Sequence, residues 1–539
     1  RRPEAGSWIM TTAHLSPPNG PAEPMGFDFQ RHAWFHGIGG VGYTRNPVLL
    51  AQAAARESGF FAARLALSAR IREQIDGQSG AFAAAIMAGD RSALTPQTLS
   101  ALRQSNLAHL LAISGLHMGL LAGFVFGALR VCLSLTPGLG GGRWPKKIAA
   151  LGALLAAACY LGLSGGNVAT QRAFIMTAVA LCAVLLNRRA ISLRALAIAA
   201  SLLLIARPEV LFGPGFQMSF AATTALVVVF EKWGQLRAGK PKLPYASGLA
   251  VGTVLSSAIA GLATLPIAAA HFNQIAHYGL LANLVSVPLM GTLVIPMAVL
   301  AVCLMPLGLD ALPLRIMSWG LEWILLVAQT TSEWPAAISK VPALPAWAFA
   351  CLCFGLLLLA ILRSPLRWLA LAPVCAALVA WAIAPRPYIL ISDTGTLVGV
   401  MSDQGRALSR AKGSGFVAGI WLENDGDASV QMQAAVRWPK SAGASKYALP
   451  SGATLHVARG KRGLADFAGC RPGDVAVFSD AFEGEAACMI FDKQRLRRTG
   501  SVALSPSGAG GFNVTTAREN AGRRLWNDRA TRAWLLRAQ

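Results

Sequence analysis

Apolar runs separated by short polar loops dominate the chain from residue 107 to residue 385. A helix needs roughly 20 apolar residues to cross a hydrocarbon core about 30 Å thick, and most of these runs approach that length. The runs lie at 107–134, 147–163, 171–187, 191–206, 211–231, 246–270, 279–306, 314–330, 346–362 and 366–385. The pattern predicts a polytopic α-helical membrane domain of about ten spans over residues 105–385, although Pro288 and Pro296 could break the run 279–306.

The segments on either side of this domain have different patterns. Residues 1–47 are rich in Pro, Gly and aromatics, so we interpret them as the end of a small extramembrane domain and an irregular arm. Residues 48–104 mix charged and apolar positions with roughly helical period, which predicts amphipathic helices at the membrane interface. After Pro387, short alternating runs with turn residues indicate a separate β-rich soluble domain over 386–539. The chain opens on Arg1-Arg2 without an initiator Met, so we expect it to begin inside a longer protein.

Charge sets the expected orientation. The chain is 54% hydrophobic and only 14% charged, yet its net charge is +23, and cytoplasmic loops of membrane proteins collect Lys and Arg. The basic residues fall in alternate loops: Arg143, Lys146 and Lys147; Arg188, Arg189 and Arg194; Lys232, Arg237, Lys240 and Lys242; Arg363 and Arg367. With ten spans, both flanking domains then lie outside the cytoplasm. An error of one in the helix count would invert the C-terminal domain.

The run Leu107–Arg130 carries polar groups inside an apolar stretch. An unpaired polar group in hydrocarbon costs several kcal/mol, so we predict that this helix lies inside a bundle. Ser114 and His117 are three residues apart on one face and either line a path or hydrogen-bond to neighbouring helices, whereas His109 lies near the membrane boundary. Glycines four apart allow close helix approach, which assigns packing roles to Gly115, Gly119, Gly123 and Gly127.

Further polar residues interrupt later runs. Arg172 begins the third run, where it either snorkels to water or faces a pore as a cation for phosphate. Gly213-Pro214-Gly215 resembles a broken helix start that lines a cavity. Asn273 and Asn283 either cap broken helices or line the path. The candidate channel-lining or gating residues are therefore Ser114, His117, Arg172, Gln217, Ser219, Asn273 and Asn283.

The remaining chemistry is sparse. Seven of the nine cysteines lie in apolar runs, while Cys470 and Cys488 lie in the C-terminal domain and form either a disulfide or two free thiols. No G-x-x-x-x-G-K-[ST] sequence is present, so we expect neither a built-in ATP motor nor a cofactor. The basic tail Arg518–Arg537 either contacts phosphates or is a solvated charged face.

Five stretches in order resemble the ComEC competence-protein family. They are NLAHLLAISGLHMG (106–119), QRAFIM (171–176), PEVLFGPGFQMSF (208–220), TLPIAAAHFN (264–273) and GLLANLVSVP (279–288). The aromatic-rich lead-in before residue 44 resembles the end of that family's OB-like domain. The resemblance implies a bacterial inner-membrane channel that passes single-stranded DNA into the cytoplasm during natural transformation. It also implies contact with membrane lipid, a periplasmic DNA-binding protein and a cytoplasmic helicase or motor.

One departure from the family concerns the C-terminal domain. Many relatives end in a metallo-β-lactamase-like nuclease, whose H-x-H-x-D-H motif holds two metal ions. After Pro387 this chain has one histidine, His456, so we expect no metal site and no nuclease activity; the domain is either a degenerate version or unrelated. Two other functions stay open: a transporter or flippase for another polyanionic or lipid substrate, and an intramembrane hydrolase using Ser114 with His117 or His271.

Overall fold

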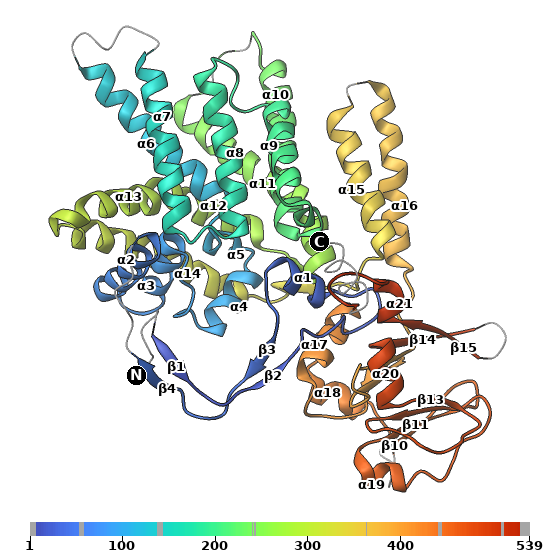
Figure 1. Ribbon diagram of the computed structural model, residues 1–539. Coiled ribbons are helices and arrows are strands. Elements are labelled where there is room, and N and C mark those ends of the chain that lie inside the picture. Colours follow the sequence, from blue (N-terminus) through green and yellow to red (C-terminus); the bar gives the residue numbers. More distant parts are fainter. Residues whose placement is uncertain are drawn as a thin grey trace, which may run out of the picture. The chain divides into compact units, whose positions relative to one another are not determined.

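The computed structural model describes residues 7–52, 59–136, 144–239, 241, 244–362, 364–439, 445–507 and 511–528 (Figure 1). The chain divides into two compact units. The helical unit comprises Arg1–Met10, Leu50–Ser339 and Leu357–Arg367, and the mixed unit comprises Thr11–Leu49, Lys340–Leu356 and Trp368–Gln539.

Helices make up the helical unit. Its described helices are α2 (Phe60–Gln74), α3 (Gly77–Ala88), α4 (Pro96–Gln104), α5 (Ala108–Leu111), α6 (Gly115–Leu135), α7 (Trp144–Leu163), α8 (Val168–Leu185), α9 (Leu193–Ala206), α10 (Pro214–Leu236), α11 (Tyr245–Phe272), α12 (Gly279–Leu289), α13 (Ile295–Leu304) and α14 (Ala311–Glu333). A short strand, β5 (Gln274–Ala276), pairs with β6 (Ile338–Lys340).

Among the described residues, seven helical segments are long and apolar enough to cross a membrane. They are Gly115–Leu135, Trp144–Leu163, Val168–Leu185, Tyr245–Phe272, Gly279–Leu307, Ala311–Glu333 and Pro365–Ala382. Two shorter apolar helices are α9 and α15 (Ala346–Ile361). Each apolar run of the sequence contains a helix, which confirms the mostly helical prediction, while the count of ten spans remains a prediction.

Two runs differ in detail from the prediction. The run 107–134 is not one helix: α5 ends at Leu111, and Ser114 takes extended backbone angles at the N-cap position of α6, where serine is favoured. The run 279–306 is not broken by its prolines. Pro288 lies inside α12, Pro296 lies in the first turn of α13, and a π-helical turn, Met290–Val294, keeps the chain helical between them.

Residues 48–104 form a short strand, β4 (Leu49–Gln52), and the three helices α2, α3 and α4. The middle helix departs from the amphipathic prediction because every residue from Ser79 to Ala88 is buried. Its core residues pack with those of α12, α13 and α14. Small side chains explain this: α3 reads GQSGAFAAAIMA, and a Cβ at Gly80 would lie only 1.9 Å from the Ile75 carbonyl oxygen.

The mixed unit begins with an N-terminal arm. Strands β2 (His14–Ser16) and β3 (Val41–Tyr43) pair on either side of α1 (Phe29–Phe35). The preceding strand, β1 (Trp8–Met10), belongs to the helical unit and pairs with β4. Next in sequence come α15 and α16 (Leu371–Ala382), whose facing residues Ala348, Leu352 and Ala377 form one buried cluster.

The C-terminal domain contains two sheets. The five-stranded sheet runs β15 (Phe512–Thr516), β14 (Val502–Pro506), β7 (Ile389–Ile391), β8 (Val398–Ser402), β9 (Gly405–Leu408), and the four-stranded sheet runs β10 (Ser445–Ala448), β11 (Thr454–Ala458), β12 (Val475–Phe478), β13 (Met489–Phe491). The first sheet is antiparallel throughout; in the second, β11–β12 and β12–β13 are parallel. The prediction of a β-rich C-terminal region is confirmed.

The two sheets pack face to face, because Ile389 and Val400 of one share a buried cluster with Leu455 and Val477 of the other. Helices cover the outer faces. Those on the first sheet are α17 (Gly415–Asn424) and α18 (Gln431–Val436), and α19 (Gly460–Ala465) packs on the second. Two more short helices, α20 (Lys493–Thr499) and α21 (Ala517–Ala521), contact each other.

The N-terminal arm is built into this domain. Ser501 Oγ donates to the Pro21 carbonyl (2.7 Å), Trp421 Nε1 to the Ala22 carbonyl (2.9 Å) and Trp526 Nε1 to Asp28 Oδ2 (2.9 Å). The segment before α15 joins the same body, since the Asn424 carbonyl accepts from the backbone N–H of Ala343 (2.8 Å). The sequence did not predict this association of distant segments.

A buried ion network lies at this junction. Arg386 donates to Glu23 (2.8 Å) and to Asp425 (2.8 Å), and Arg406 donates to the other oxygen of Asp425. Arg386 also donates to the second oxygen of Glu23 (3.0 Å), and Asn424 Nδ2 donates the third hydrogen bond that this carboxylate accepts (2.9 Å). Glu23 is 4% exposed and Arg406 is fully buried, so the two guanidinium groups and two carboxylates neutralise one another out of water.

Candidate functional site

The first group of predicted residues, Ser114 and His117, lies at the break between α5 and α6. Ser114 Oγ lies 3.1 Å from His117 Nδ1. The His117 side chain is fully buried, and its Nε2 atom has no hydrogen-bond partner among the described residues. His109 lies apart from this pair, with its Nδ1 3.0 Å from the Asn106 carbonyl oxygen.

The start of α12 contacts the chain just before α5. A Cβ at Gly279 would lie 2.8 Å from the Asn106 side chain, and one at Gly291 would lie 3.2 Å from Leu120 of α6. The first and fifth family-like stretches therefore contact each other. On α12, Asn283 Oδ1 and Ser286 Oγ also have no partner among the described residues.

Ser286 was missed by the sequence reasoning. It is fully buried and stands three residues after Asn283, on the same side of α12. Its signal was available, because it lies inside the stretch GLLANLVSVP. Asn283 itself lies within α12 and does not cap it, whereas Asn273 takes a left-handed conformation (φ 51°) and ends α11, as a cap would.

A second group forms where α8, α10 and α11 meet. Gln217 Oε1 lies 2.7 Å from His271 Nε2, and Gln217 Nε2 donates to the Leu211 carbonyl (2.9 Å). A Cβ at Gly215 would lie 2.7 Å from Arg172 Nη1, so the glycine makes room for the guanidinium. The third family-like stretch thus contacts both the second and the fourth, and α10 begins at Pro214, as the broken helix start predicted.

Ser219 and Arg172 complete the second group. Ser219 Oγ donates to Met176 Sδ at 3.7 Å, which ties α10 to α8. Arg172 makes no ion pair with any described carboxylate and is only partly exposed. A cation without a carboxylate partner next to helix ends is available to an anion.

The two groups are neighbours. Ile113 and Met118, on either side of the Ser114–His117 pair, pack against Ala173, which follows Arg172. The chain of contacts runs through the start of α6, the start of α8, the start of α10, the end of α11 and the start of α12. Polar side chains that are scattered in sequence therefore gather at one end of the helical unit.

The glycine stripe does not have the predicted packing role in the described residues. A Cβ built at Gly115, Gly119, Gly123 or Gly127 meets nothing within 4 Å. Close helix approach through small residues occurs elsewhere instead, as at Gly152, where an added Cβ would lie 2.4 Å from Leu129. The spacing of the glycines alone could not show whether a neighbouring helix packs against them.

The Ser114–His117 pair satisfies one geometric requirement of a hydrolase, since the two side chains are within hydrogen-bond distance. No described side chain hydrogen-bonds to the other ring nitrogen of His117 to orient it. His271 contacts Gln217. The pair therefore has a nucleophile and a base but no third group like that of a catalytic triad.

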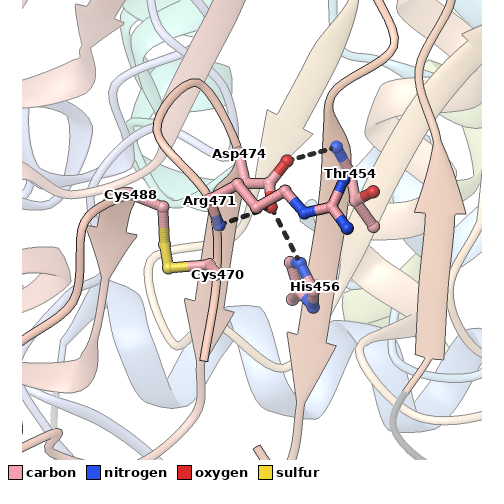
Figure 2. Close-up of a disulfide and its surroundings, with 6 residues drawn as sticks. All are labelled: Thr454, His456, Cys470, Arg471, Asp474 and Cys488. Atoms are coloured by element: carbon pink, nitrogen blue, oxygen red, sulfur yellow. Dashed lines mark hydrogen bonds and ion pairs between the residues drawn. A yellow bond between two sulfur atoms is a disulfide. The ribbon is translucent and has the colours of Figure 1, made fainter. Parts of the chain in front are cut away.

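In the C-terminal domain, Cys470 and Cys488 form a disulfide, with Cα atoms 5.7 Å apart (Figure 2). Asp474 beside it accepts from the backbone N–H groups of Thr454 (2.7 Å) and Arg471 (2.9 Å), and lies 3.4 Å from His456 Nε2. Burial raises the pKa of Asp474, but these hydrogen bonds outweigh it and hold the pKa below its usual range. His456 thus contacts a structural carboxylate.

Over the part of the chain that the structure describes, no group of three or more His, Cys, Asp or Glu side chains is arranged to hold a metal ion. His456 contributes one imidazole beside one carboxylate, fewer donors than the three or four protein ligands of a zinc site.

These features define a class: a polytopic helical membrane protein with a β-rich C-terminal domain. The chain belongs to the competence protein family, whose model matches residues 86–366. It is 28% identical to ComE operon protein 3 of Bacillus subtilis (strain 168) over 57% of this chain and 37% of that protein. It is 28% identical to competence protein ComA of Neisseria gonorrhoeae over 75% of this chain and 55% of that protein.

A third relative is recombination protein 2 of Haemophilus influenzae, 27% identical over 51% of this chain and 34% of that protein. The matches span between about a third and about half of these relatives' own lengths. No solved structure matches the chain.

Proposed function

We propose that this protein is the inner-membrane channel through which single-stranded DNA enters the cytoplasm during natural transformation. The observation that carries the proposal is the meeting of all five family-like stretches at one end of the helical unit. Arg172 supplies a cation there without a described carboxylate partner, which suits a phosphate backbone.

The buried polar atoms nearby suit a hydrated path. His117 Nε2, Asn283 Oδ1 and Ser286 Oγ lack partners in the described residues, and such groups are costly unless water or a substrate meets them. We assign lining or gating roles to Ser114, His117, Arg172, Gln217, Ser219, Asn273 and Asn283.

Orientation follows from the mixed unit. The arm around Glu23, the segment around Ala343 and the domain after Pro387 are one folded body, so they lie on one side of the membrane. The chain therefore crosses an even number of times between the arm and Ala343. It also crosses an even number of times between Ala343 and Pro387, so α15 crosses if α16 does, although α15 has only 16 residues.

The disulfide supports an extracytoplasmic side for this body, because disulfides persist in oxidising compartments. Single strands would then arrive from a periplasmic DNA-binding protein and be pulled by a cytoplasmic helicase or motor. We assign no nuclease step to the C-terminal domain, which we interpret as a degenerate form of the family's metallo-β-lactamase-like domain.

The test follows fluorescent double-stranded DNA in cells that lack this gene and are complemented with variants. Wild type should restore cytoplasmic label, while His117→Ala and Arg172→Gln should leave it outside the inner membrane. Arg189→Gln, in a loop assigned to the cytoplasm, is the charge-matched control and should restore entry. Unchanged entry in the deletion strain would refute DNA import as the role.

The alternative is a transporter or flippase for another polyanionic or lipid substrate, because Arg172 would serve any anion equally well. Purified protein separates the two functions: single-stranded DNA, but not lipid headgroups, should compete for binding if the channel proposal holds. The Ser114–His117 contact also permits one direct check. Labelling of Ser114 by a serine-reactive probe would support a hydrolase function and not a channel function.

A further inference from the structure

An open groove lies on the C-terminal domain between α20 and α21. Its volume is about 630 Å³, and it is lined by Arg498, Thr499, Thr516, Arg518, Glu519, Gly522, Arg523 and Asp528. None of these residues belongs to the polar groups of the helical unit. Three guanidinium groups and two hydroxyls line it, against two carboxylates.

The arginines of the groove differ from the ion-paired arginines of the domain. Arg386, Arg406 and Arg437 each form an ion pair with an aspartate. Arg498, Arg518 and Arg523 form none with any described residue, and Arg498 and Arg523 are exposed. Their charge is therefore directed at the groove and solvent and is not used to hold the fold together.

The groove is held in shape by hydrogen bonds that do not involve those guanidinium groups. Asp492 caps α20 by accepting from the Arg495 N–H (2.9 Å), and Thr516 caps α21 through the Glu519 N–H (3.1 Å). Gly522 takes a left-handed conformation (φ 64°), and its carbonyl accepts from Asn527 Nδ2 (2.9 Å). This turn keeps Arg523 at the edge of the groove.

We propose that this groove binds the phosphodiester backbone of single-stranded DNA on its way to the membrane domain. Guanidinium groups bind phosphate oxygens through paired hydrogen bonds, and the volume accommodates a short stretch of backbone. Glu519 and Asp528 reduce the net charge to one positive unit, so the strand is held loosely enough to move on. The inference rests on the proposed function and names where the strand is first captured.

The test measures binding of a fluorescent oligothymidylate to the full chain in nanodiscs over a range of salt concentrations. The groove triple variant Arg498→Ala/Arg518→Ala/Arg523→Ala is compared with Arg462→Ala/Arg471→Ala/Arg497→Ala. The second triple removes the same charge from exposed positions of the same domain that do not line the groove. Inorganic phosphate and anionic lipid vesicles are the competitors.

We expect the groove triple to bind more weakly, with a slope of log affinity against log salt smaller by about 2, since each lost phosphate contact on a single strand removes about 0.7. The control triple should keep the wild-type slope, and phosphate should compete better than vesicles. Equal losses of DNA affinity in both triple variants, or displacement of DNA by vesicles but not by phosphate, would refute the proposal that the groove binds the DNA backbone. If the groove triple binds DNA as tightly as wild type, the proposal that the groove binds DNA is also refuted. That conclusion stands even if the wild-type protein restores DNA uptake in cells. Wild type that binds through the groove yet restores no uptake would instead refute the channel.

Discussion

Glu23 offers the sharpest test of how the arm and the C-terminal domain form one body. Its carboxylate is 4% exposed and accepts two hydrogen bonds from Arg386 (2.8 and 3.0 Å) and one from Asn424 (2.9 Å). The change Glu23→Gln keeps the size of the side chain and removes only its charge. Arg386 and Arg406 would then share Asp425 as their remaining buried carboxylate.

The expected magnitude follows from that charge balance. The network holds two positive and two negative groups, and the variant leaves one positive charge uncompensated out of water. Removing one partner of a buried ion pair costs about 3–5 kcal/mol. At the lower end this raises the released fraction of the arm by more than a hundredfold.

The assay is limited proteolysis of the full chain in detergent across a denaturant series, with cleavage of the arm as the readout. The control is Glu483→Gln, an exposed carboxylate of the same domain. The double variant Glu23→Gln/Arg386→Met should recover part of the loss, since it restores charge balance. An arm that is equally protected in Glu23→Gln and wild type would refute the argument that this network holds the body together.

Three further changes give distinct results. Cys470→Ser should lower the free energy of unfolding of the C-terminal domain by about 3 kcal/mol, as expected for a loop closed at a separation of 18 residues, and reducing agent should abolish the difference in denaturant melts. Burial raises the pKa of Asp427, but hydrogen bonds from Arg437 and Ser429 outweigh burial and lower it overall. The contribution of Asp427 to the free energy of unfolding is therefore complete above the unfolded pKa near 4 and is lost as pH falls through the folded pKa. Asp427→Asn should therefore flatten the acidic side of a plot of the free energy of unfolding against pH. Gly279→Ala should destabilise the helical unit by about 1–3 kcal/mol in thermal melts because its Cβ meets Asn106 at 2.8 Å, whereas Gly115→Ala, which meets nothing within 4 Å, should not; equal melting of the two would contradict the contact.

Hydrophobic length was enough to locate the helices, because a run of apolar residues between polar loops has few other stable arrangements. It could not locate the break before α6, where residues 112–114 lie outside both helices and Ala112 and Ser114 have extended backbone angles, within a run that reads as continuous. Nor could it show that α3 is buried on all sides, since its alanines suit an interface and a core equally well.

The candidate site was partly predictable. The site roles of the motif residues stay a prediction, and their pairing depends on contacts such as that of Gln217 with His271, which are 54 residues apart. Compartment and count allowed either a disulfide or two free thiols at Cys470 and Cys488, and the structure shows the disulfide. The arm's place in the C-terminal domain had no local signal, because Glu23 lies in an ordinary loop sequence.

The ion network also sets an order of events during synthesis. Glu23 and Arg386 are 363 residues apart, and all of the helical unit except Arg1–Met10 is translated between them. Because chains emerge from the N-terminus, the arm leaves the ribosome long before its binding partner exists. Under the proposed topology, completion of this body therefore requires an even number of crossings in between: a chain that has skipped one crossing delivers Arg386 to the opposite side of the membrane and leaves Glu23 without its partner.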